Sequence, residues 1–518
     1  MGDERDPRAE GPFLGTNLER LVHALAGRGP RSLDPEYNAW LALRTPGPRE
    51  LAAQARAADG LPWRPFVDVF VRRRPDDDAA VVRTRASLRA QTYQRFAFRE
   101  APGGEAEARL ARGIGDLVIA MDAGDALAPH ALFAIAATGD AGAELFYFDE
   151  DRLAGSLREA PWFKPGWSPE ELESHDYTAA ARAFRRDLLV RAGVRDLAAA
   201  LPSLRRVRHV PDVLLHRRED ASLPRERLAP APRLARRVRV AAIVPTKDGA
   251  DLLDACVRSL DAHPNRAELE LVIVDNGSTR ADARALLSRL RERPGCRVLS
   301  WPAAFNWSAV NNFAARRTSS EFLLFMNNDV EATRAGWLDA MLALASRPEI
   351  GLVGAQVVYP DDTIQHGGVV VGMTGFAGHL FQGCLASART RFGPTHVTRN
   401  CSSVTGACML VRREVFQRLG GFDERFVLCG SDVALGLRAM SLGLRNAVTP
   451  EARLVHHESR TRGAEVPASD YRVSLEVYGP WLRAGDPYYN PNLSLRDGTC
   501  RLRLAREDML ARARWIAR

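Results

Sequence analysis

The feature that most constrains the fold of this chain is a regular alternation of short apolar runs and helical patterns between residues 238 and 358. Five apolar runs predict buried strands, and the segments between them have the spacing of amphipathic helices. The predicted strands are 238–244, 269–274, 297–300, 322–326 and 351–358, and the predicted helices are 251–260, 281–291, 308–317 and 334–346. Because strands that alternate with helices pair in parallel, the sequence predicts an α/β fold with a doubly wound, mostly parallel sheet.

Three of these predicted strands end in polar residues. They are followed by the stretches 245–248 (PTKD), 275–279 (DNGST) and 327–329 (NND). In open α/β sheets, ligands bind in the crevice beyond the carboxyl ends of the strands. These residues could instead only cap the turns that follow, but their collection at one edge of one sheet favours a ligand-binding crevice.

The composition is that of an ordinary globular protein, with 46% hydrophobic residues, and a length of 518 residues predicts two or three domains. The seven cysteines include no C-x-x-C pair, which argues against a disulfide framework or a structural zinc site and favours a reducing cytoplasm. We expect no membrane span and no signal peptide. The net charge of +8 favours anionic partners, but the arginines are scattered, so nucleic acid is not expected among them.

Two stretches divide the chain. Its first 60 residues are rich in Ala and Arg and are expected to be helical, and a Pro- and Arg-rich stretch at 223–232 is typical of a linker. We therefore predict a helical segment at 1–60, a smaller α/β domain at 61–225, the main α/β domain at 226–495 and a basic helical tail at 496–518. The tail is expected to pack across the protein, and contact with an anionic membrane surface is the alternative.

The predicted strands are not followed by a G-x-G-x-x-G or a Walker lysine motif, which argues against the usual dinucleotide and P-loop sites. The chain instead has an ordered set of motifs: VPTKDG at 244, VDNGST at 274, FNWSAVNN at 305, FMNNDVEATRAGWL at 325, VTGACMLVRREVF at 404, GGFDERF at 420, HHES at 456 and DPYYNPNLSL at 486. In these motifs it resembles family 2 glycosyltransferases of the Rossmann-like GT-A fold. Among them it is most similar to the tandem bacterial enzymes of O-antigen or rhamnan-type polysaccharide assembly, over about residues 236–495.

The resemblance implies a metal site for the diphosphate of the sugar donor. Asp329 matches the metal-binding position of the family's acidic motif and would coordinate Mg²⁺ or Mn²⁺, whereas Asn327 departs from a strict D-x-D pattern. A histidine often completes this site, and His456 and His457 both match it. Since neighbours on a strand point to opposite faces, one of them is expected to bind the metal, with His456 favoured and His457 as the alternative.

The resemblance also implies a site for a nucleotide-diphosphate sugar of the UDP, dTDP or GDP type. Thr246, Asp248 and Asp275 match positions that hold the base and the ribose in this family. The complete set of residues expected around the donor is Pro245, Thr246, Asp248, Asp275, Asn306, Asn312 and Asn328.

Asp432 matches the catalytic carboxylate of the family. Inversion at the anomeric carbon requires a base on the face opposite the departing nucleotide, and a carboxylate suits that task. The second acid that usually follows two residues later is replaced here by Ala434. A helix N-cap is the alternative role for Asp432, and it is compatible with catalysis. Thr405 and Gly421 match the acceptor side, although Gly421 could equally end a helix.

The first half of the chain contains weaker echoes of the same family, such as GDLVIAMDAGDALAPHAL at 115 and ELFYFDEDR at 144. Asp122 and Asp125 form a spaced remnant of a metal motif, and an acidic cluster follows at 149–151. The nucleotide turn and the base motif are missing. We therefore predict a degenerate, inactive GT-A-like domain kept for packing, acceptor binding or partner contact, with sugar or nucleotide binding without transfer as the alternative.

Together these matches imply an inverting, metal-dependent glycosyltransferase that moves a sugar to a hydroxyl of a cell-surface polysaccharide or a lipid-linked glycan. The expected place is the cytoplasm, with peripheral contact at the inner face of the plasma membrane left open. A non-catalytic nucleotide- or glycan-binding scaffold is the alternative, because Asn327 and Ala434 depart from the family pattern. A nucleotidyltransferase is disfavoured, since the loop after the first strand has only one Gly and one Lys.

Overall fold

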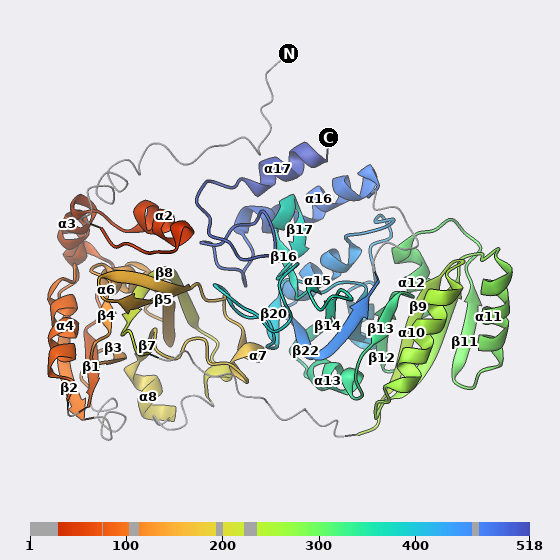
Figure 1. The fold of residues 1–518 in the computed structure, drawn as a ribbon, viewed down its shortest axis with the longest axis horizontal. Coiled ribbons are helices and arrows are strands. Elements are labelled where there is room, and N and C mark those ends of the chain that lie inside the picture. Colours follow the sequence, from red (N-terminus) through yellow and green to blue (C-terminus); the bar gives the residue numbers. More distant parts are fainter. Residues whose placement is uncertain are drawn as a thin grey trace, which may run out of the picture.

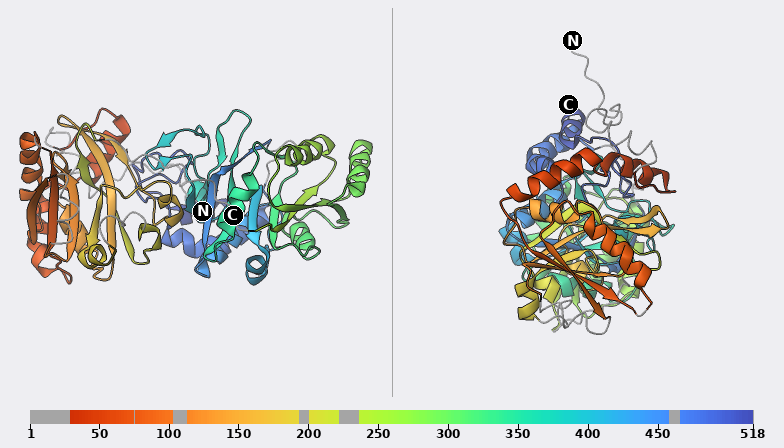
Figure 2. Two further views of the ribbon diagram at one scale, coloured as in Figure 1. Left: turned by 90° about the horizontal axis from the view of Figure 1, so that it is seen from below. Right: turned by 90° about the vertical axis from the view of Figure 1, so that its left-hand side faces the viewer.

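The computed structural model describes residues 29–74, 76–102, 113–192, 200–221, 236–457 and 466–517. These form a first half (residues 29–221) and a second half (residues 236–517), each built around a twisted sheet (Figure 1). Figure 2 shows the halves side by side along the long axis of the molecule. The predicted linker at 223–232 and residues 1–28 of the predicted helical segment lie outside the described residues.

The sheet of the second half runs in the order β11-β10-β9-β12-β21-β14-β22-β13. Its strands are β9 (Arg239–Thr246), β10 (Glu268–Asp275), β11 (Cys296–Ser300), β12 (Phe322–Met326), β13 (Val330–Ala332), β14 (Ile350–Val358), β21 (Cys408–Arg412) and β22 (Arg445–His456), with β15 (Ile364–His366) and β20 (Arg399–Cys401) at its side. The strands β11, β10, β9 and β12 are parallel neighbours, as predicted. The prediction misses β21, which lies antiparallel between β12 and β14 because the chain returns after β14 to insert it.

Helices cover both faces of this sheet, as a doubly wound fold requires. Alternate residues of a strand point to opposite faces, so Val244 of β9 belongs to one core and Ile243 to the other. The first core is closed by α10 (Ala250–Ala262), α11 (Ala281–Glu292) and α13 (Trp337–Ala345), and the second by α12 (Trp307–Ala315), α14 (Arg413–Arg418) and α15 (Ser431–Ser441). The helices predicted between residues 251 and 346 are confirmed, with ends shifted by a few residues.

The sheet of the first half repeats this strand order. Its strands β1 (Val67–Arg73), β2 (Phe96–Pro102), β3 (Leu117–Asp122), β4 (Ala126–Leu127), β5 (Leu145–Ala154), β7 (Arg182–Arg185) and β8 (Val207–Arg217) run in the order β2-β1-β3-β7-β5-β8-β4, with β6 (Leu157–Trp162) beside β5. Their relative directions match those of β10, β9, β12, β21, β14, β22 and β13 pair by pair. The first half is therefore a second, shorter copy of the same fold.

The remaining elements surround the two sheets. The first half adds the helices α2 (Pro35–Arg44), α3 (Pro48–Ala57), α4 (Asp78–Arg89), α6 (Ala131–Ala137), α7 (Pro169–Leu172) and α8 (Arg186–Ala192). The second half adds the hairpins β16 (Val369–Val371) with β17 (Ala377–His379) and β18 (Arg389–Thr390) with β19 (Gly393–Pro394), and the helices α16 (Ala468–Ala484) and α17 (Met509–Ile516). In the predicted helical tail, α17 is preceded by an irregular stretch at 496–508.

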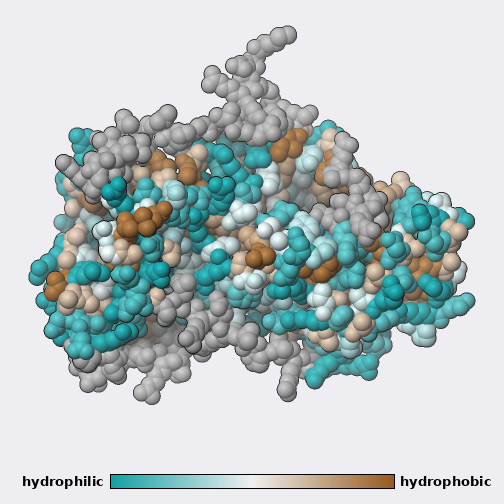
Figure 3. Space-filling model, viewed as in Figure 1, coloured by the Kyte–Doolittle hydropathy of each residue, from teal (hydrophilic) through white to brown (hydrophobic). Residues whose placement is uncertain are grey.

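The surface seen in Figure 3 is mainly hydrophilic, with separate apolar patches. Scattered apolar patches of this kind are normal on folded proteins. None of the described helices is long and apolar enough to cross a membrane.

The two halves meet in a further hydrophobic cluster, which contains residues of both. Phe163 of the first half packs with Phe392 and Tyr489 of the second. Beside this core, Arg445 donates two hydrogen bonds to the carboxylate of Glu170, at 2.7 and 3.1 Å. A bidentate ion pair fixes orientation as well as adding energy, so the two sheets are held in a defined relative position.

Candidate active site

The carboxyl ends of β9 and β10 are held together by hydrogen bonds between the residues that follow them. Ser278 donates its backbone N–H to Asp275 Oδ1 (2.9 Å), and its hydroxyl accepts the N–H of Asp248 (3.0 Å). Asp248 in turn accepts the backbone N–H groups of Arg280 (2.8 Å) and Thr279 (2.6 Å). These N–H groups hold the pKa of the Asp248 carboxyl below its usual value. The two turns thus form one rim at the edge of the sheet.

Asn328 joins this rim to the end of β12. Its side-chain amide donates to the hydroxyl of Thr246 (3.1 Å), which is buried at the end of β9. Pro245 is buried beside it, in register with Val274 of β10. The prediction that three neighbouring strands bring polar residues to one edge of the sheet is therefore confirmed.

Asp329 and His456 lie next to each other beyond the end of β12. The antiparallel pairing of β13 with β22 places Val330 opposite His456. The His456 Nε2 is 3.0 Å from Asp329 Oδ1, and both side chains are buried. The other ring nitrogen, Nδ1, is 2.6 Å from Gln365 Oε1, and this contact fixes the ring so that Nε2 faces the carboxylate.

His457 points away from this pair, as strand alternation requires. Its Nε2 lies 2.8 Å from Glu331 Oε1, and its backbone N–H donates to the carbonyl of Asp329 (3.1 Å). Of the two neighbouring histidines, His456 is the one whose ring faces Asp329.

The groups around Asp329 suit a hard divalent cation that binds together with a ligand. A carboxylate oxygen and an imidazole nitrogen are accompanied by the amide of Asn327, whose Nδ2 is 3.4 Å from His456 Nε2. Within the described residues, no cluster brings three or more His, Cys, Asp or Glu side chains around one position. Mg²⁺ is commonly held by one or two protein ligands together with substrate phosphates and waters. The residues therefore fit a metal that arrives with a diphosphate better than a permanently bound one.

Asp432 is the second residue of α15. Its Oδ2 accepts the N–H of Gly406 (2.9 Å) and its Oδ1 that of Val433 (2.8 Å). The N-cap of this helix is Gly430, with a φ of 103°, so the N-cap alternative for Asp432 is wrong. Ala434 is buried in an apolar cluster, which would disfavour a second acid at that position.

The loop 405–407 connects Asp432 to the metal-binding motif. Gly406 donates to Asp432, and the carbonyl of the next residue, Ala407, accepts the N–H of Asn327 (3.1 Å). Thr405 supports the turn, because its hydroxyl accepts the N–H of Ala407 (3.3 Å). The predicted acceptor-side residue Thr405 therefore lies between the predicted base and the predicted metal ligands.

Three other predicted residues brace the loop between α14 and α15. Asn312 accepts the N–H of Phe422 and donates to its carbonyl, both at 2.9 Å. Asn306 is the N-cap of α12 and donates to the carbonyl of Glu424 (2.9 Å). Gly421 has a φ of 74°, and a Cβ there would lie 2.7 Å from Asn312 Oδ1. These residues shape the loop through contacts within the protein, and a direct contact with the donor stays a prediction.

Two residues beside the site were missed by the sequence patterns. Gln365 orients His456, and His366 accepts the N–H of Thr405 on its Nε2 (3.3 Å). Burial holds the pKa of His366 well below its usual value. Both residues come from β15, which has only three residues and therefore no readable periodicity. The one signal in the sequence is a polar pair directly before two glycines.

The first half contains an aspartate–histidine pair in the same strand arrangement as Asp329 and His456; each of these two places is called a corner. β4 places His216 opposite the residue after Asp125, as β13 places His456 opposite the residue after Asp329. The ring of His216 is held by a carboxylate: its Nδ1 is 2.7 Å from Asp151 Oδ1. Asp125 and His216 are thus the topological counterparts of Asp329 and His456.

Arginines surround the acidic remnant of the first half. Asp125 accepts the backbone N–H groups of Asp122 (3.1 Å) and Arg218 (2.8 Å), and Arg217 Nε lies 3.7 Å from its Oδ2. Asp122 forms an ion pair with Arg72 at 2.7 Å. Burial raises the pKa of Asp125 to about 6. The two carboxylates of the predicted remnant are therefore engaged by the chain itself.

The acidic cluster at 149–151 is also engaged within the protein. Asp149 accepts the side-chain amide of Asn490 from the second half, at 2.9 Å. Glu150 forms a buried ion pair with Lys164 (2.8 Å), and Asp151 accepts the hydroxyl of Tyr37 (2.7 Å). These contacts give the cluster a role in packing.

Comparisons with known proteins find a family match in the second half. The model of glycosyl transferase family 2 matches residues 241–420. The O-antigen biosynthesis protein RfbC of Myxococcus xanthus is 38% identical over 97% of this chain and 46% of its own length, so the chain spans about half of that relative. An N-acetylglucosaminyl-diphospho-decaprenol L-rhamnosyltransferase of Mycobacterium tuberculosis is 29% identical over 42% of this chain and 78% of its own length.

One solved structure with some likeness is a mannosyltransferase of Pyrobaculum calidifontis in complex with GDP-Man and Mn²⁺, at 19% identity and a TM-score of 0.36 over 49% of this chain and 67% of that chain. The family match covers β9 to β21, in which the strand ends, Asp329 and the loop 405–407 lie. The GT-A fold class that the motifs implied is confirmed. Residues 241–420 thus match glycosyl transferase family 2, the family that the sequence motifs resemble.

Proposed function

We propose that this protein transfers a sugar from a nucleotide-diphosphate donor to a hydroxyl of a cell-surface polysaccharide or a lipid-linked glycan, with inversion and with the help of a divalent metal. The observation that carries this proposal is the short path from Asp432 through the loop 405–407 to Asn327 and the Asp329–His456 pair. An inverting transfer needs a base and a diphosphate site near each other.

The names of the relatives support the acceptor class. One relative is named for O-antigen biosynthesis, and the name of the other joins L-rhamnosyl transfer to an N-acetylglucosaminyl-diphospho-decaprenol. We therefore propose a polyprenyl-diphosphate-linked sugar as the first acceptor to test on this chain.

The nucleoside of the donor is proposed to lie on the rim formed after β9 and β10. Asp275 uses its Oδ1 to accept the N–H of Ser278, and its Oδ2 has no hydrogen-bond partner within the described part of the chain. This oxygen can accept a ribose hydroxyl or an N–H of the base. Thermal unfolding with UDP, dTDP and GDP identifies the donor class, because a ligand at 100 times its dissociation constant stabilises a protein by about 2.7 kcal/mol.

Asp329 and His456 are the residues that would hold Mg²⁺ or Mn²⁺, His456 through its Nε2. When bound, the metal supplies positive charge beside the departing diphosphate. The contact between His456 Nδ1 and Gln365 Oε1 holds the ring in the orientation that this role needs. The buried position of both ligands limits access of water to this corner of the site.

Asp432 is proposed to take the proton of the acceptor hydroxyl. The backbone N–H of Gly406 donates to Oδ2 of Asp432, and that of Val433 donates to Oδ1. These two hydrogen bonds orient the carboxylate and leave a lone pair on each oxygen. The acceptor oxygen forms a bond to the anomeric carbon on the face opposite the nucleotide, and its proton moves to Oδ1 or Oδ2 of Asp432. The bond from that carbon to the donor diphosphate breaks in the same step, and the nucleoside diphosphate leaves with the bonding electrons.

The test is sugar transfer by Asp432→Asn. Asparagine has nearly the same shape, so the fold should survive, but it cannot take the proton. We expect kcat to fall by about 10²- to 10⁴-fold, with nucleotide binding unchanged. Asp423→Asn is the matched control, because it makes the same substitution at a carboxylate that is paired with Arg425 at 2.8 Å. Transfer at the wild-type rate in Asp432→Asn would exclude Asp432 as the base.

The first half is proposed to be inactive in transfer, because its counterpart carboxylates are engaged by arginines. Packing, acceptor binding or partner contact is its proposed role. The boundaries 61–225 and 226–495 remain proposals for the two domains. If the wild-type protein binds a nucleotide but transfers sugar to none of the acceptors tried, the non-catalytic scaffold replaces the transferase proposal.

A further inference from the structure

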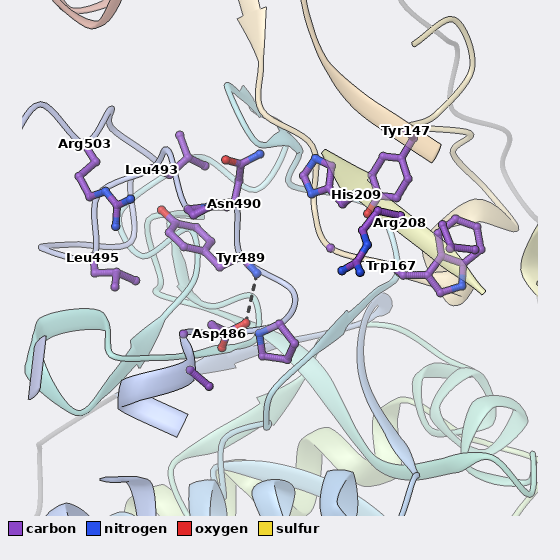
Figure 4. Close-up of a pocket in the computed structure, with 16 residues that line it drawn as sticks. Tyr147, Trp167, Arg208, His209, Asp486, Tyr489, Asn490, Leu493, Leu495 and Arg503 are labelled. Carbon is purple, nitrogen blue, oxygen red and sulfur yellow. Dashed lines mark hydrogen bonds between the residues drawn. The ribbon is translucent and has the colours of Figure 1, made fainter. Parts of the chain in front are cut away.

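We propose that a cavity between the two halves binds an acidic saccharide segment of the acceptor glycan, away from the reacting hydroxyl. This inference rests on the proposed function, because it assigns a place to part of that acceptor. The cavity has a volume of about 390 Å³ and is lined by both halves. Figure 4 shows Tyr147, Trp167 and His209 on one side and Asn490 on the other. Ligand pockets commonly lie at such domain interfaces and have volumes of roughly 300–1,000 Å³.

One wall of the cavity is aromatic. His209 stacks on Tyr147, with ring centroids 4.5 Å apart, and Trp167 lies beside Tyr147 at 6.0 Å. Flat rings with a polar edge suit a sugar, whose C–H face is apolar while its hydroxyls need hydrogen bonds. His209 Nε2 is 3.0 Å from Asp149 Oδ1. Because a carboxylate accepts, Nε2 carries the hydrogen in the neutral ring, and Nδ1 of that tautomer has a lone pair for a hydroxyl.

The charged lining of the cavity favours an anionic ligand. Arg208 is exposed and its ion pair with Asp140 is long, at 3.4 Å. Arg503 is half-buried and makes no ion pair with any described residue; burial lowers the pKa of its guanidinium, and the charge of Glu507 acts in the opposite direction. A guanidinium fits a carboxylate or a phosphate through two parallel hydrogen bonds. The ligand that completes this lining therefore combines sugar rings with a negative charge.

The carboxylate of Asp486 also lines the cavity, but it acts as a brace. Its Oδ1 accepts the N–H groups of Tyr488 (2.9 Å) and Tyr489 (3.1 Å). Its Oδ2 accepts the N–H of Val371 (2.7 Å) and the hydroxyl of Ser402 (2.6 Å). With both oxygens engaged, Asp486 holds the wall of the cavity in place and offers little to a ligand.

The same brace links the cavity to the proposed base. Asp486 binds the hydroxyl of Ser402, and the next residue, Ser403, donates its hydroxyl to the backbone carbonyl of Asp432 (2.7 Å). Only the residues 402–403 separate the wall of the cavity from the helix that presents Asp432. An acceptor whose terminal hydroxyl meets Asp432 therefore has the cavity within reach of its preceding sugars.

The experiment is calorimetric titration of the full chain, without donor, with three probes: tetragalacturonate, the neutral maltotetraose and inorganic phosphate. We expect tetragalacturonate to bind at least about tenfold more tightly than either of the others, since it alone combines sugar rings with carboxylates. Equal binding of maltotetraose would overturn the acidic part of the assignment. Equal binding of phosphate would overturn the saccharide part, and no binding of tetragalacturonate would overturn the assignment as a whole.

Variants locate the binding in the cavity. Arg503→Gln should weaken tetragalacturonate binding by about tenfold or more, because it removes a charge-assisted pair. Arg208→Gln, at an exposed position where folding is safe, should weaken binding in the same direction. Arg501→Gln is the matched control from the same segment, since Arg501 faces Glu36 at 3.4 Å and should leave the affinity unchanged. Unchanged affinity in Arg503→Gln and Arg208→Gln would overturn the assignment.

Nucleotide binding on the same proteins separates this inference from the proposed function. We expect Mn²⁺-dependent stabilisation by the donor nucleotide to be unchanged in Arg503→Gln, because the strand ends do not line this cavity. If the wild type binds nucleotide but not tetragalacturonate, the cavity assignment fails alone. If it binds tetragalacturonate but no nucleotide, the donor site of the proposed function fails and the cavity assignment stands.

Discussion

The two halves build the same corner from the same pair of side chains but give the carboxylate different partners. In the second half, Asp329 faces His456, whose Nε2 is 3.0 Å away. In the first half, Asp125 is approached by Arg217, which directly follows His216 in the sequence as His457 follows His456. An imidazole can exchange its proton for a metal, whereas a guanidinium always keeps its proton and cannot be a ligand. We therefore propose that the partner of the carboxylate decides which of the two sites can take up a metal.

The ends of the central strands differ in the same way. In the second half, Thr246 of β9 accepts the amide of Asn328, a neutral contact at the edge where we place the nucleotide. In the first half, β1 ends in arginines, and Arg72 pairs with Asp122 both in the register of the sheet and through its side chain. We therefore propose that ion pairs within the chain, in place of neutral strand-end contacts, leave the first half without a nucleotide-binding edge.

A pair of matched substitutions, Asp329→Asn and Asp125→Asn, tests the proposed difference between the two carboxylates. We expect Asp329→Asn to lower sugar transfer by about 100- to 1,000-fold, because it weakens the charge that holds the metal beside the diphosphate. Asp125→Asn should leave transfer at the wild-type rate, since its corner takes no part in it. Initial rates with saturating Mn²⁺ measure both. A large loss in Asp125→Asn would show that the first half is active after all.

The next largest effect is a pH dependence of stability that belongs to the first half. Burial raises the pKa of Asp125 from 3.8 to about 6, so the folded state holds this proton more tightly than the unfolded state. The contribution of Asp125 to stability is therefore greatest below about pH 4 and declines as the pH rises towards 6, by about 3 kcal/mol in all. Asp125→Asn cannot ionise and should gain stability relative to wild type over this range in urea unfolding. The exposed Asp220→Asn should follow the wild-type curve.

The sequence predicted the second sheet well because its local signals agree. Runs such as FLLFM at 322–326 are too short for helices and too apolar for loops, and they are separated by helical patterns. The direction of β21 could not be predicted, because an apolar strand buried on both faces looks the same in either direction. Its antiparallel place depends on the path of the chain between β14 and β21, which is a tertiary property.

The candidate site could be predicted where it follows from strand geometry. The rule that ligands bind beyond strand ends located Asp248, Asp275 and Asp329, and strand alternation separated His456 from His457. The role of a site residue could not be predicted where that role depends on the hydrogen-bond partners of its side chain. Asn312, for example, sits in a donor-pocket motif, yet its amide holds the loop at Phe422. A motif gives the position of an amide along the chain but not its hydrogen-bond partners.

The two histidines, His456 and His216, can be tested in the same way. His456→Gln should weaken Mn²⁺ binding in the presence of the donor nucleotide by about 10- to 100-fold, the usual cost of disturbing a metal site. His216→Gln should leave the Mn²⁺ affinity unchanged, because its neighbour Asp125 is engaged by Arg217. Titration of Mn²⁺ followed by thermal unfolding measures both variants. Equal losses in the two would mean that both corners bind metal and would end the distinction drawn between them.

The smallest effect tests whether the ion pairs of the first half are there for stability. Arg72→Gln removes the pair with Asp122, whose partners are partly exposed, with 42% and 33% of their side-chain surface accessible. Ion pairs at such positions contribute at most about 1 kcal/mol, because water screens both charges. We therefore expect urea unfolding to show a loss below that limit, and transfer to be unchanged. A loss of several kcal/mol would mean that this pair contributes strongly to the stability of the first half. No loss at all would mean that the ion pair between Arg72 and Asp122 does not stabilise the fold.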